Sequence, residues 1–213
     1  MDHHLQKATR WWWVRHAPVS HLTHEIYGNT DPDCDTSQTQ AFASLARRLP
    51  MDAVWVVSSL RRTHQTAQAI GRAGYALPEL REEPDIGEQN FGDLHGRSHS
   101  DHAATRRDSF TGFWPLPPDE CPPNGESLTT VQARVLAVVQ RLGREHHGRD
   151  IVCVAHGGPI LTMVGHALGL DLGGAVSFSL PNLSLTLLHE IHEPLPAGPR
   201  WRAICVGERA HVD

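Results

Sequence analysis

Residues 11–16 (WWWVRH) and residues 151–156 (IVCVAH) each place a histidine directly after a short run of apolar residues. Short apolar runs of this kind are typical of strands that are buried on both faces of a parallel sheet. In open α/β sheets, ligands bind at the carboxyl ends of the strands, so both histidines are expected at one binding edge. Arg15 beside the first histidine, and Gly157-Gly158 after the second, favour an anionic ligand and therefore phosphoryl chemistry.

Outward from these two runs, apolar strands alternate with segments of helical periodicity, which predicts an α/β fold. The first half is expected to contain a strand at 53–57, a helix capped by Thr36 or Ser37, and a helix over 61–73. Ser127 is expected to begin an amphipathic helix, and Pro159 lies in the first turn of another. Short strands at an edge or in a hairpin are expected over 176–180, 184–191 and 201–206.

This order predicts a single domain over residues 1–213, a three-layer sandwich whose mostly parallel central sheet has helices on both faces. Between residues 77 and 123 the periodicity is poor and prolines are frequent, which indicates an irregular, cap-like insert at about 93–124. Two interpretations of residues 113–123 stay open. The prolines and aromatic residues either cap the pocket and set its specificity, or form a surface loop packed on its own side chains.

The composition excludes several classes of function. With 39% hydrophobic and 20% charged residues among 213, the chain is typical of globular proteins, and its net charge of −5 argues against general nucleic-acid binding. The four cysteines form no C-x-x-C pair, so neither a zinc ribbon nor a disulfide scaffold is indicated. No apolar run is long enough to span a bilayer or to act as a secretion signal, so we expect a soluble cytoplasmic protein with no membrane partner.

Phosphoryl transfer without a metal needs a nucleophile, a group that stabilises the charge of the phosphoryl oxygens, and an acid for the leaving group. A neutral imidazole can be the nucleophile and arginines can stabilise the charge. Glu88, within residues 87–92 (GEQNFG), is the candidate acid because glycines flank it in a loop.

Five motifs occur in one order along the chain, from residue 11 to about residue 165. They are Arg15-His16-Ala17, residues 58–67 (SSLRRTHQTA), residues 88–92 (EQNFG), residues 125–127 (GES) and residues 156–158 (HGG). Together they resemble the histidine phosphatase superfamily, in its phosphoglycerate mutase-like branch, which includes α-ribazole and fructose-bisphosphate phosphatases.

The resemblance implies a role for each matching position. His16 would be the nucleophile that becomes phosphohistidine, and Glu88 the proton donor. Arg15, Arg62 and His156 would hold the phosphoryl oxygens. The spacing from Thr66-Ala67 selects Arg62, with Arg61 as its less favoured neighbour. The predicted substrate-binding residues are Tyr27, Gly28 and Gly157.

The family's third motif residue is usually glycine, and here it is Ala17, which an extended backbone would accommodate. The leading hypothesis is a metal-independent phosphatase that acts on a small phosphorylated metabolite, with no cofactor and no metal. Mutase-type phosphoryl transfer and a non-catalytic regulatory relative are the alternatives. A histidine-rich metal site is a further one, although no histidine pair has an evident third ligand. Neither the particular phosphomonoester nor the oligomeric state follows from the sequence.

Overall fold

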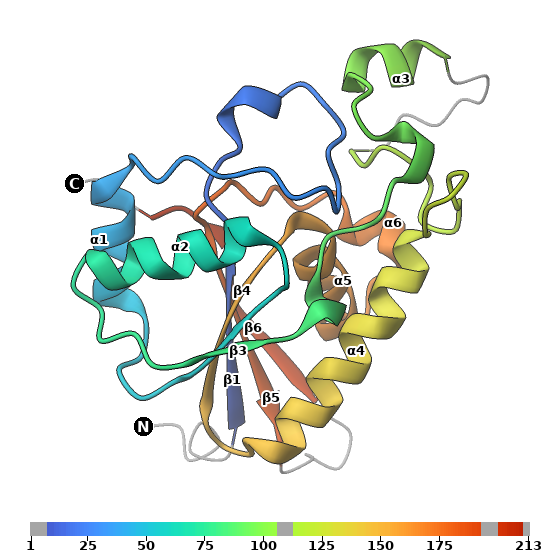
Figure 1. Ribbon diagram of the computed structural model, residues 1–213. Helices are drawn as coiled ribbons and strands as arrows, with labels where there is room; N and C mark the ends of the chain where they lie inside the picture. Colours follow the sequence, from blue (N-terminus) through green and yellow to red (C-terminus); the bar gives the residue numbers. More distant parts are fainter. Residues whose placement is uncertain (1–7, 106–112, 193–199, 211–213) are drawn as a thin grey trace.

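The computed structural model of the chain describes residues 8–105, 113–192 and 200–210 (Figure 1). Its strands and helices are, in chain order, β1 (Ala8–Arg15), α1 (Thr39–Arg48), β2 (Val54–Val57), α2 (Arg61–Arg72), β3 (Leu80–Glu82), α3 (His99–Thr105), α4 (Leu128–Glu145), β4 (Asp150–Ala155), α5 (Gly157–Leu168), α6 (Leu172–Ala175), β5 (Leu185–Ile191) and β6 (Trp201–Glu208). Among these described residues, no helix is both long enough and apolar enough to cross a membrane.

The six strands form one sheet in the order β3-β2-β4-β1-β5-β6. Strands β1 to β4 run parallel, while β5 is antiparallel to β1 and β6 is antiparallel to β5. In the β1–β4 register Trp13 lies opposite Cys153 and Arg15 lies opposite Ala155. The two central strands therefore end level with each other, and the chain leaves both at the same edge of the sheet.

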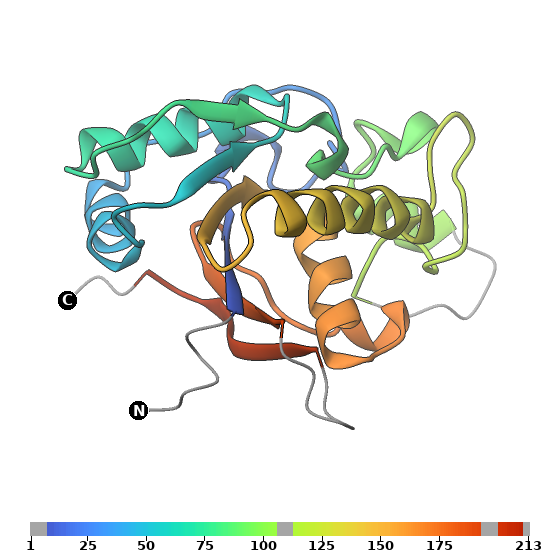
Figure 2. The same cartoon turned by 90° about the horizontal axis from the view of Figure 1, so that it is seen from below.

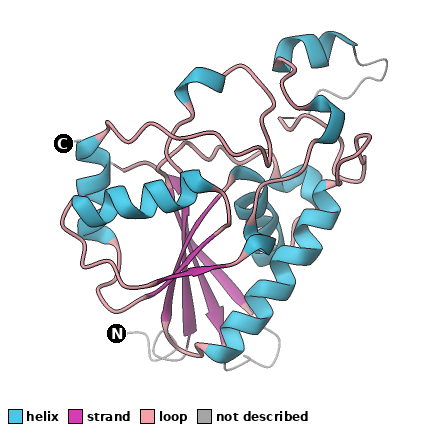
Figure 3. Cartoon of the chain, viewed as in Figure 1, coloured by secondary structure: helices cyan, strands magenta, loops and turns pink. Residues whose placement is uncertain are grey.

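Helices cover both faces of the sheet, α1 and α2 on one and α4 and α5 on the other (Figures 2 and 3). Side chains alternate along each strand, so Trp11 and Trp13 pack toward α4 and α5, whereas Val14 packs with the α1 and α2 residues. Trp11 and Trp13 are fully buried in this arrangement. The predicted three-layer α/β sandwich is confirmed.

Two local predictions differ from the structure. Helix α1 begins at Thr39 after Gln38, without a side-chain cap, because the N–H of Ser37 donates to Asp35 Oδ1 (2.8 Å) in a preceding turn. The predicted strand over 176–180 is a loop, since the backbone N–H groups of Val176 and Phe178 are used in turn-type hydrogen bonds at the end of α6. The predicted cap of α4 is confirmed: Ser127 accepts from the backbone N–H of Thr130.

The polar loops after β1 and the segment that carries α3 lie at the end of the sheet where β1 and β4 finish (Figure 1). Residues 113–116, which lead into the proline-rich stretch, have no regular helix or strand. Residues 106–112 of the predicted insert, and residues 1–7 and 211–213 of the predicted domain, lie outside the described residues. The bounds of the insert (about 93–124) and of the domain (1–213) therefore stay predictions.

Candidate active site

A pocket of about 1100 Å³ lies at this edge of the sheet. Its lining includes five of the eight predicted site residues, namely Arg15, Tyr27, Gly28, Glu88 and Gly157. The other three are buried against one another: His16 is 1% exposed, and Arg62 and His156 are 0% exposed. The structure therefore brings all eight predicted residues to one region, although the first and the last of them are residues 15 and 157.

His16 follows the last residue of β1 and continues its pairing with β4, because its backbone N–H donates to Ala155 O (3.0 Å). Its ring nitrogen Nδ1 lies 2.7 Å from the carbonyl oxygen of Ala17. A carbonyl oxygen only accepts, so Nδ1 carries the proton and Nε2 keeps its lone pair. Burial, with the nearby charges of Arg62 and Arg15, lowers the pKa of His16 well below its usual range. His16 is therefore a neutral imidazole with a free nucleophilic nitrogen.

Ala17, at the position where the family resemblance implies glycine, is fully buried. Its backbone N–H donates to Thr66 Oγ1 (2.9 Å) on α2, which fixes the turn that follows β1. Among the described residues other than glycine, only Asn124 and Leu183 have a positive φ angle. The backbone at residue 17 therefore does not require glycine, and alanine is compatible with the site.

Arg62 lies in the first turn of α2 and donates hydrogen bonds in three directions. They reach Gly28 O (2.7 Å), Thr30 O (2.6 Å) and His156 Nδ1 (3.2 Å). A guanidinium has five N–H groups, so donors remain for an anion. Its neighbour Arg61 instead faces the surface, where Asp31 Oδ2 accepts from its Nε (3.0 Å).

Gly28 explains why a small residue is needed beside this arginine. Its φ is +44°, a conformation that favours glycine, and an added Cβ would lie 2.7 Å from Gln89 O. Its carbonyl orients Arg62. Tyr27 lines the pocket next to it, and its ring centroid is 5.4 Å from Arg62 Cζ. Burial raises the pKa of the Tyr27 hydroxyl.

His156 ends the turn after β4, and its ring centroid is 5.1 Å from that of His16. Because Nδ1 accepts from Arg62, Nε2 carries the proton and donates to Ser58 Oγ (2.7 Å). Burial, then the charge of Arg62, lowers the pKa of His156 well below its usual range. Both ring nitrogens contact protein groups here, and the predicted role of His156 as a direct charge stabiliser stays a prediction.

Arg15 has a buried donor without a partner. One terminal nitrogen of its guanidinium donates to Leu180 O, but Nε is buried and makes no hydrogen bond. A buried unsatisfied N–H is unfavourable, by roughly 1–3 kcal/mol. Arg15 also lines the pocket, so its guanidinium charge is well placed to attract an anion bound there.

Glu88 is held at the N-terminus of α5. Its Oε1 accepts from the backbone N–H groups of Gln89 (2.9 Å) and Gly158 (3.0 Å). A Cβ on Gly158 would lie only 2.5 Å from that oxygen, so glycine is what lets the carboxylate approach the helix. Gly157 faces the same carboxylate, with its Cβ position 3.5 Å from Glu88 Oε2. The glycine pair thus positions the candidate acid.

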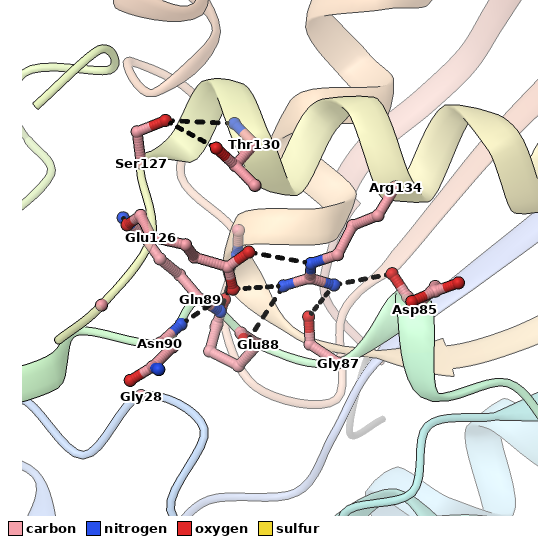
Figure 4. Close-up of polar contacts among 12 residues, drawn as sticks. Gly28, Asp85, Gly87, Glu88, Gln89, Asn90, Glu126, Ser127, Thr130 and Arg134 are labelled. Atoms are coloured by element: carbon pink, nitrogen blue, oxygen red, sulfur yellow. Dashed lines mark hydrogen bonds and ion pairs between the residues drawn. The ribbon is translucent and has the colours of Figure 1, made fainter. Parts of the chain in front are cut away.

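The loop that carries Glu88 is fastened to α4 by Arg134, a residue that sequence reasoning missed (Figure 4). Its guanidinium donates to the carbonyl oxygens of Asp85 (2.6 Å), Gly87 (2.8 Å) and Glu88 (3.2 Å). It also donates to both carboxylate oxygens of Glu126, at 2.8 and 3.1 Å. One arginine therefore binds three carbonyl groups of the acid-bearing loop.

Glu126 completes this network from the other side, because its Oε1 also accepts from the backbone N–H of Asn90 (3.0 Å). Its own carbonyl accepts from the Gln89 side chain (2.8 Å). Glu126 lies just before α4 and Arg134 lies within it. Residues on both sides of Glu88 are thus tied to one helix (Figure 4).

Leu183 contacts the backbone of Arg15: its N–H donates to Arg15 O (3.0 Å). Leu183 has a positive φ of +60° in this position. Next to it, the Asn182 side chain donates to His16 O (2.8 Å). Sequence reasoning missed both of these residues. In the part of the chain that the structure describes, no group of three or more histidine, cysteine, aspartate or glutamate side chains is arranged to bind a metal ion.

Comparisons with known proteins agree with this geometry. The model of the histidine phosphatase superfamily (branch 1) matches residues 11–196. The phosphoglycerate mutase-like protein 4 of Arabidopsis thaliana is 30% identical over 155 residues, which cover 70% of this chain and 67% of that protein. The metal-independent phosphoserine phosphatase of the same plant is 28% identical over 182 residues, covering 83% of this chain and 74% of the relative.

A solved structure described as mycobacterial hydrolase 2 is also similar to this chain. It superimposes with a TM-score of 0.81 and 27% sequence identity, covering 97% of this chain and 94% of the other. The similarity therefore extends over nearly the whole fold, beyond the five short motifs.

Proposed function

This chain belongs to the histidine phosphatase superfamily, and we propose that it hydrolyses small phosphomonoesters with His16 as the nucleophile. It is a metal-independent phosphatase, a phosphoric monoester hydrolase. The observation that carries the proposed role of His16 is its hydrogen bond from Nδ1 to Ala17 O, which leaves Nε2 unprotonated in a buried site beside two arginines. That combination supplies a nucleophile and a positive site for the phosphoryl oxygens at once.

In the first step, the lone pair of His16 Nε2 attacks phosphorus and forms a P–N bond. The bond from phosphorus to the ester oxygen breaks, and its electron pair goes to that oxygen, which takes a proton from Glu88. The guanidinium charge of Arg15 and the remaining donors of Arg62 stabilise the phosphoryl oxygens. The Ala17 carbonyl keeps the developing imidazolium oriented.

In the second step, water attacks the phosphorus of phosphohistidine. Glu88, now a carboxylate, takes a proton from the water as the new P–O bond forms. The P–N bond breaks, its electron pair returns to His16 Nε2, and inorganic phosphate leaves. Glu88 serves as acid and then as base from one position, which the contacts with Gln89 and Gly158 maintain.

Mutase-type phosphoryl transfer is the alternative, and the name of the Arabidopsis mutase-like relative favours considering it. A mutase keeps the phosphorylated histidine away from water until a second alcohol accepts the phosphoryl group. Here the pocket of about 1100 Å³ leaves room for water beside Glu88, which supports hydrolysis. The proposal of an active enzyme, as opposed to a non-catalytic relative, rests on the complete set of His16, Arg62, Glu88 and His156.

Release of phosphate from p-nitrophenyl phosphate in excess chelator tests the proposal. We expect turnover by the wild-type protein and none by His16→Ala. Equal turnover by the two proteins would exclude His16 as nucleophile. A parallel assay with 3-phosphoglycerate separates hydrolysis, which releases inorganic phosphate, from transfer, which does not.

Three narrower expectations stay predictions. They are an α-ribazole phosphatase-like substrate, a partner that is a small phosphorylated metabolite, and a location in the cytoplasm. The pocket volume supports only the second of them, since a small phosphorylated metabolite suits a pocket of this size.

A further inference from the structure

The part of the pocket beyond the phosphoryl-binding groups is lined by apolar and aromatic side chains. We call it the apolar lobe and define it by six residues: Phe91, Phe113, Trp114, Leu161, Phe178 and Leu180. They come from four stretches of the chain, at residues 91, 113–114, 161 and 178–180. Large aromatic side chains that converge on a pocket provide much of the binding free energy of an apolar ligand.

The apolar lobe adjoins the leaving-group side of the site. The Cβ position of Gly157 lies 3.5 Å from Glu88 Oε2 and 3.6 Å from the ring of Trp114, so the acid and the indole face the same point. An ester oxygen that takes its proton from Glu88 therefore places the carbon skeleton of its alcohol next to Trp114. The lobe is thus positioned to contact the alcohol part of the substrate.

The lobe combines a fixed wall with an exposed rim. Trp114 Nε1 donates to Gln89 Oε1 (2.8 Å), and its ring centroid is 6.0 Å from that of Phe91. Phe113, next to it, is 82% exposed. A large apolar side chain exposed at the rim of a pocket is unfavourable in water and is compensated when a ligand covers it.

The charges around the lobe disfavour a second anionic group on the substrate. Of the described residues that line the pocket, only Arg15 is an arginine or lysine, whereas Glu25 and Glu88 are acidic. His99 adds no positive charge at neutral pH, because burial and the nearby His102 and His24 lower its pKa. Within the described part of the lining, a carboxylate or second phosphate that lies near Glu25 would therefore be repelled.

We propose that this pocket selects phosphomonoesters of bulky apolar or aromatic alcohols that carry no second negative charge. The inference rests on the proposed phosphatase function and names its substrate class. It assigns the alcohol group to the apolar lobe and the phosphoryl group to Arg15, Arg62 and His16.

Binding of non-hydrolysable phosphonates, measured by calorimetry, tests this selectivity without requiring turnover. We expect phenethylphosphonate to bind about 10- to 100-fold more tightly than ethylphosphonate, because its ring removes apolar surface from water. Phe113→Ala combined with Phe178→Ala should reduce that ratio by about tenfold. Met51→Ala is the matched control, because Met51 is also exposed (79%). Met51 precedes β2 and does not line the pocket, so this substitution should leave the affinity ratio unchanged.

A second pair of phosphonates tests whether a second negative charge on the ligand weakens binding. A phenethylphosphonate with a carboxylate on its ring should bind at least about tenfold more weakly than the unsubstituted compound, and Glu25→Gln should narrow this difference. Similar affinities for ethylphosphonate and phenethylphosphonate, or a ratio unchanged by the two phenylalanine substitutions, would overturn the proposal. Phosphonate affinities do not depend on catalysis. Turnover of p-nitrophenyl phosphate by the wild-type protein therefore tests the phosphatase function separately, and its absence would contradict that function alone.

Discussion

The carboxylate oxygen Oε1 of Glu88 lies 3.0 Å from the backbone nitrogen of Gly158, in the first turn of α5. This contact joins the two halves of the site, because Gly158 follows the buried His156 and Glu88 lies in a loop that precedes α4. The position of the candidate acid therefore depends on the absence of a side chain at residue 158, where a Cβ would approach to 2.5 Å.

Gly158→Ala is expected to displace the Glu88 carboxylate. Only the end of a flexible side chain has to move, so the free energy of unfolding should change by less than about 1 kcal/mol. We expect kcat/KM for ethyl phosphate to fall by about 10- to 100-fold, since a displaced acid protonates the leaving group poorly. The decrease should be smaller for p-nitrophenyl phosphate, whose leaving group needs no protonation. Gly173→Ala, where the nearest atom is 3.4 Å away, is the control, and equal losses for both esters would contradict the role of Glu88.

Arg134 is expected to act through Glu88 as a positioning residue. Arg134→Lys removes the planar fork that binds Glu126 and three carbonyl groups, so kcat/KM for ethyl phosphate should fall by about tenfold. Stability should decrease by about 2 kcal/mol in urea unfolding. Arg141→Lys on the same helix is the matched control, because Arg141 has a single partner, Glu83, and is half-exposed. An equal loss with ethyl and p-nitrophenyl phosphate would indicate a purely structural role.

Arg62 and Arg61 provide a second matched pair. Lysine at position 62 cannot reproduce the three directed hydrogen bonds to Gly28, Thr30 and His156. We expect Arg62→Lys to lower kcat/KM by about 100-fold, in the range found when a charge-stabilising donor is removed. Arg61→Lys should stay within about threefold of the wild type, because Arg61 is exposed and binds Asp31 at the surface. Steady-state kinetics would show the assignment to be wrong if the two variants were equally impaired.

The two buried histidines predict how stability depends on pH. Burial holds the pKa of His16 and His156 well below the unfolded value of about 6.5, so below that pH the unfolded chain binds more protons than the folded protein. The free energy of unfolding should therefore fall as the pH decreases from 6.5, by up to about 1.4 kcal/mol per pH unit for each histidine. Above about 6.5 this contribution is constant.

His16→Asn should make this acid slope shallower by up to about 1.4 kcal/mol per pH unit in urea unfolding between about pH 5 and 8. The asparagine amide retains a donor for Ala17 O, so the fold is expected to persist. His21→Asn, at an exposed position, is the control. A slope that His16→Asn leaves unchanged would contradict a neutral, buried His16.

Much of the fold could be predicted because its central strands are strongly apolar. The apolar runs at residues 11–14 and 151–155 contain no charged residue, and their burial on both faces follows from this pattern. Strand β3 (Leu80–Glu82) could not be predicted, because it has three residues and two of them are charged. The strand expected over 176–180 was wrong, since its apolar residues instead line the pocket.

The site could be predicted as a set of residues but not as a set of contacts. His16 and His156 were found from the strands that precede them, and Ala17 was found to be compatible once its φ was known. Arg134 was missed because three of its partners are backbone carbonyls, which any sequence at positions 85, 87 and 88 could supply, and its side-chain partner Glu126 lies outside the helix. Backbone acceptors leave no mark in the sequence.

If His16 is the nucleophile, it becomes covalently phosphorylated during each turnover. Rapid quenching of the wild-type enzyme during turnover of p-nitrophenyl phosphate, followed by peptide mass spectrometry, detects such a phosphoenzyme. We expect a phosphoryl group on His16 that is stable in alkali and lost in acid, as a P–N bond requires, and its absence in His16→Ala. Turnover that proceeds with the phosphoryl group on another residue, or with no phosphoenzyme in the wild type and undiminished rate in His16→Ala, would contradict it.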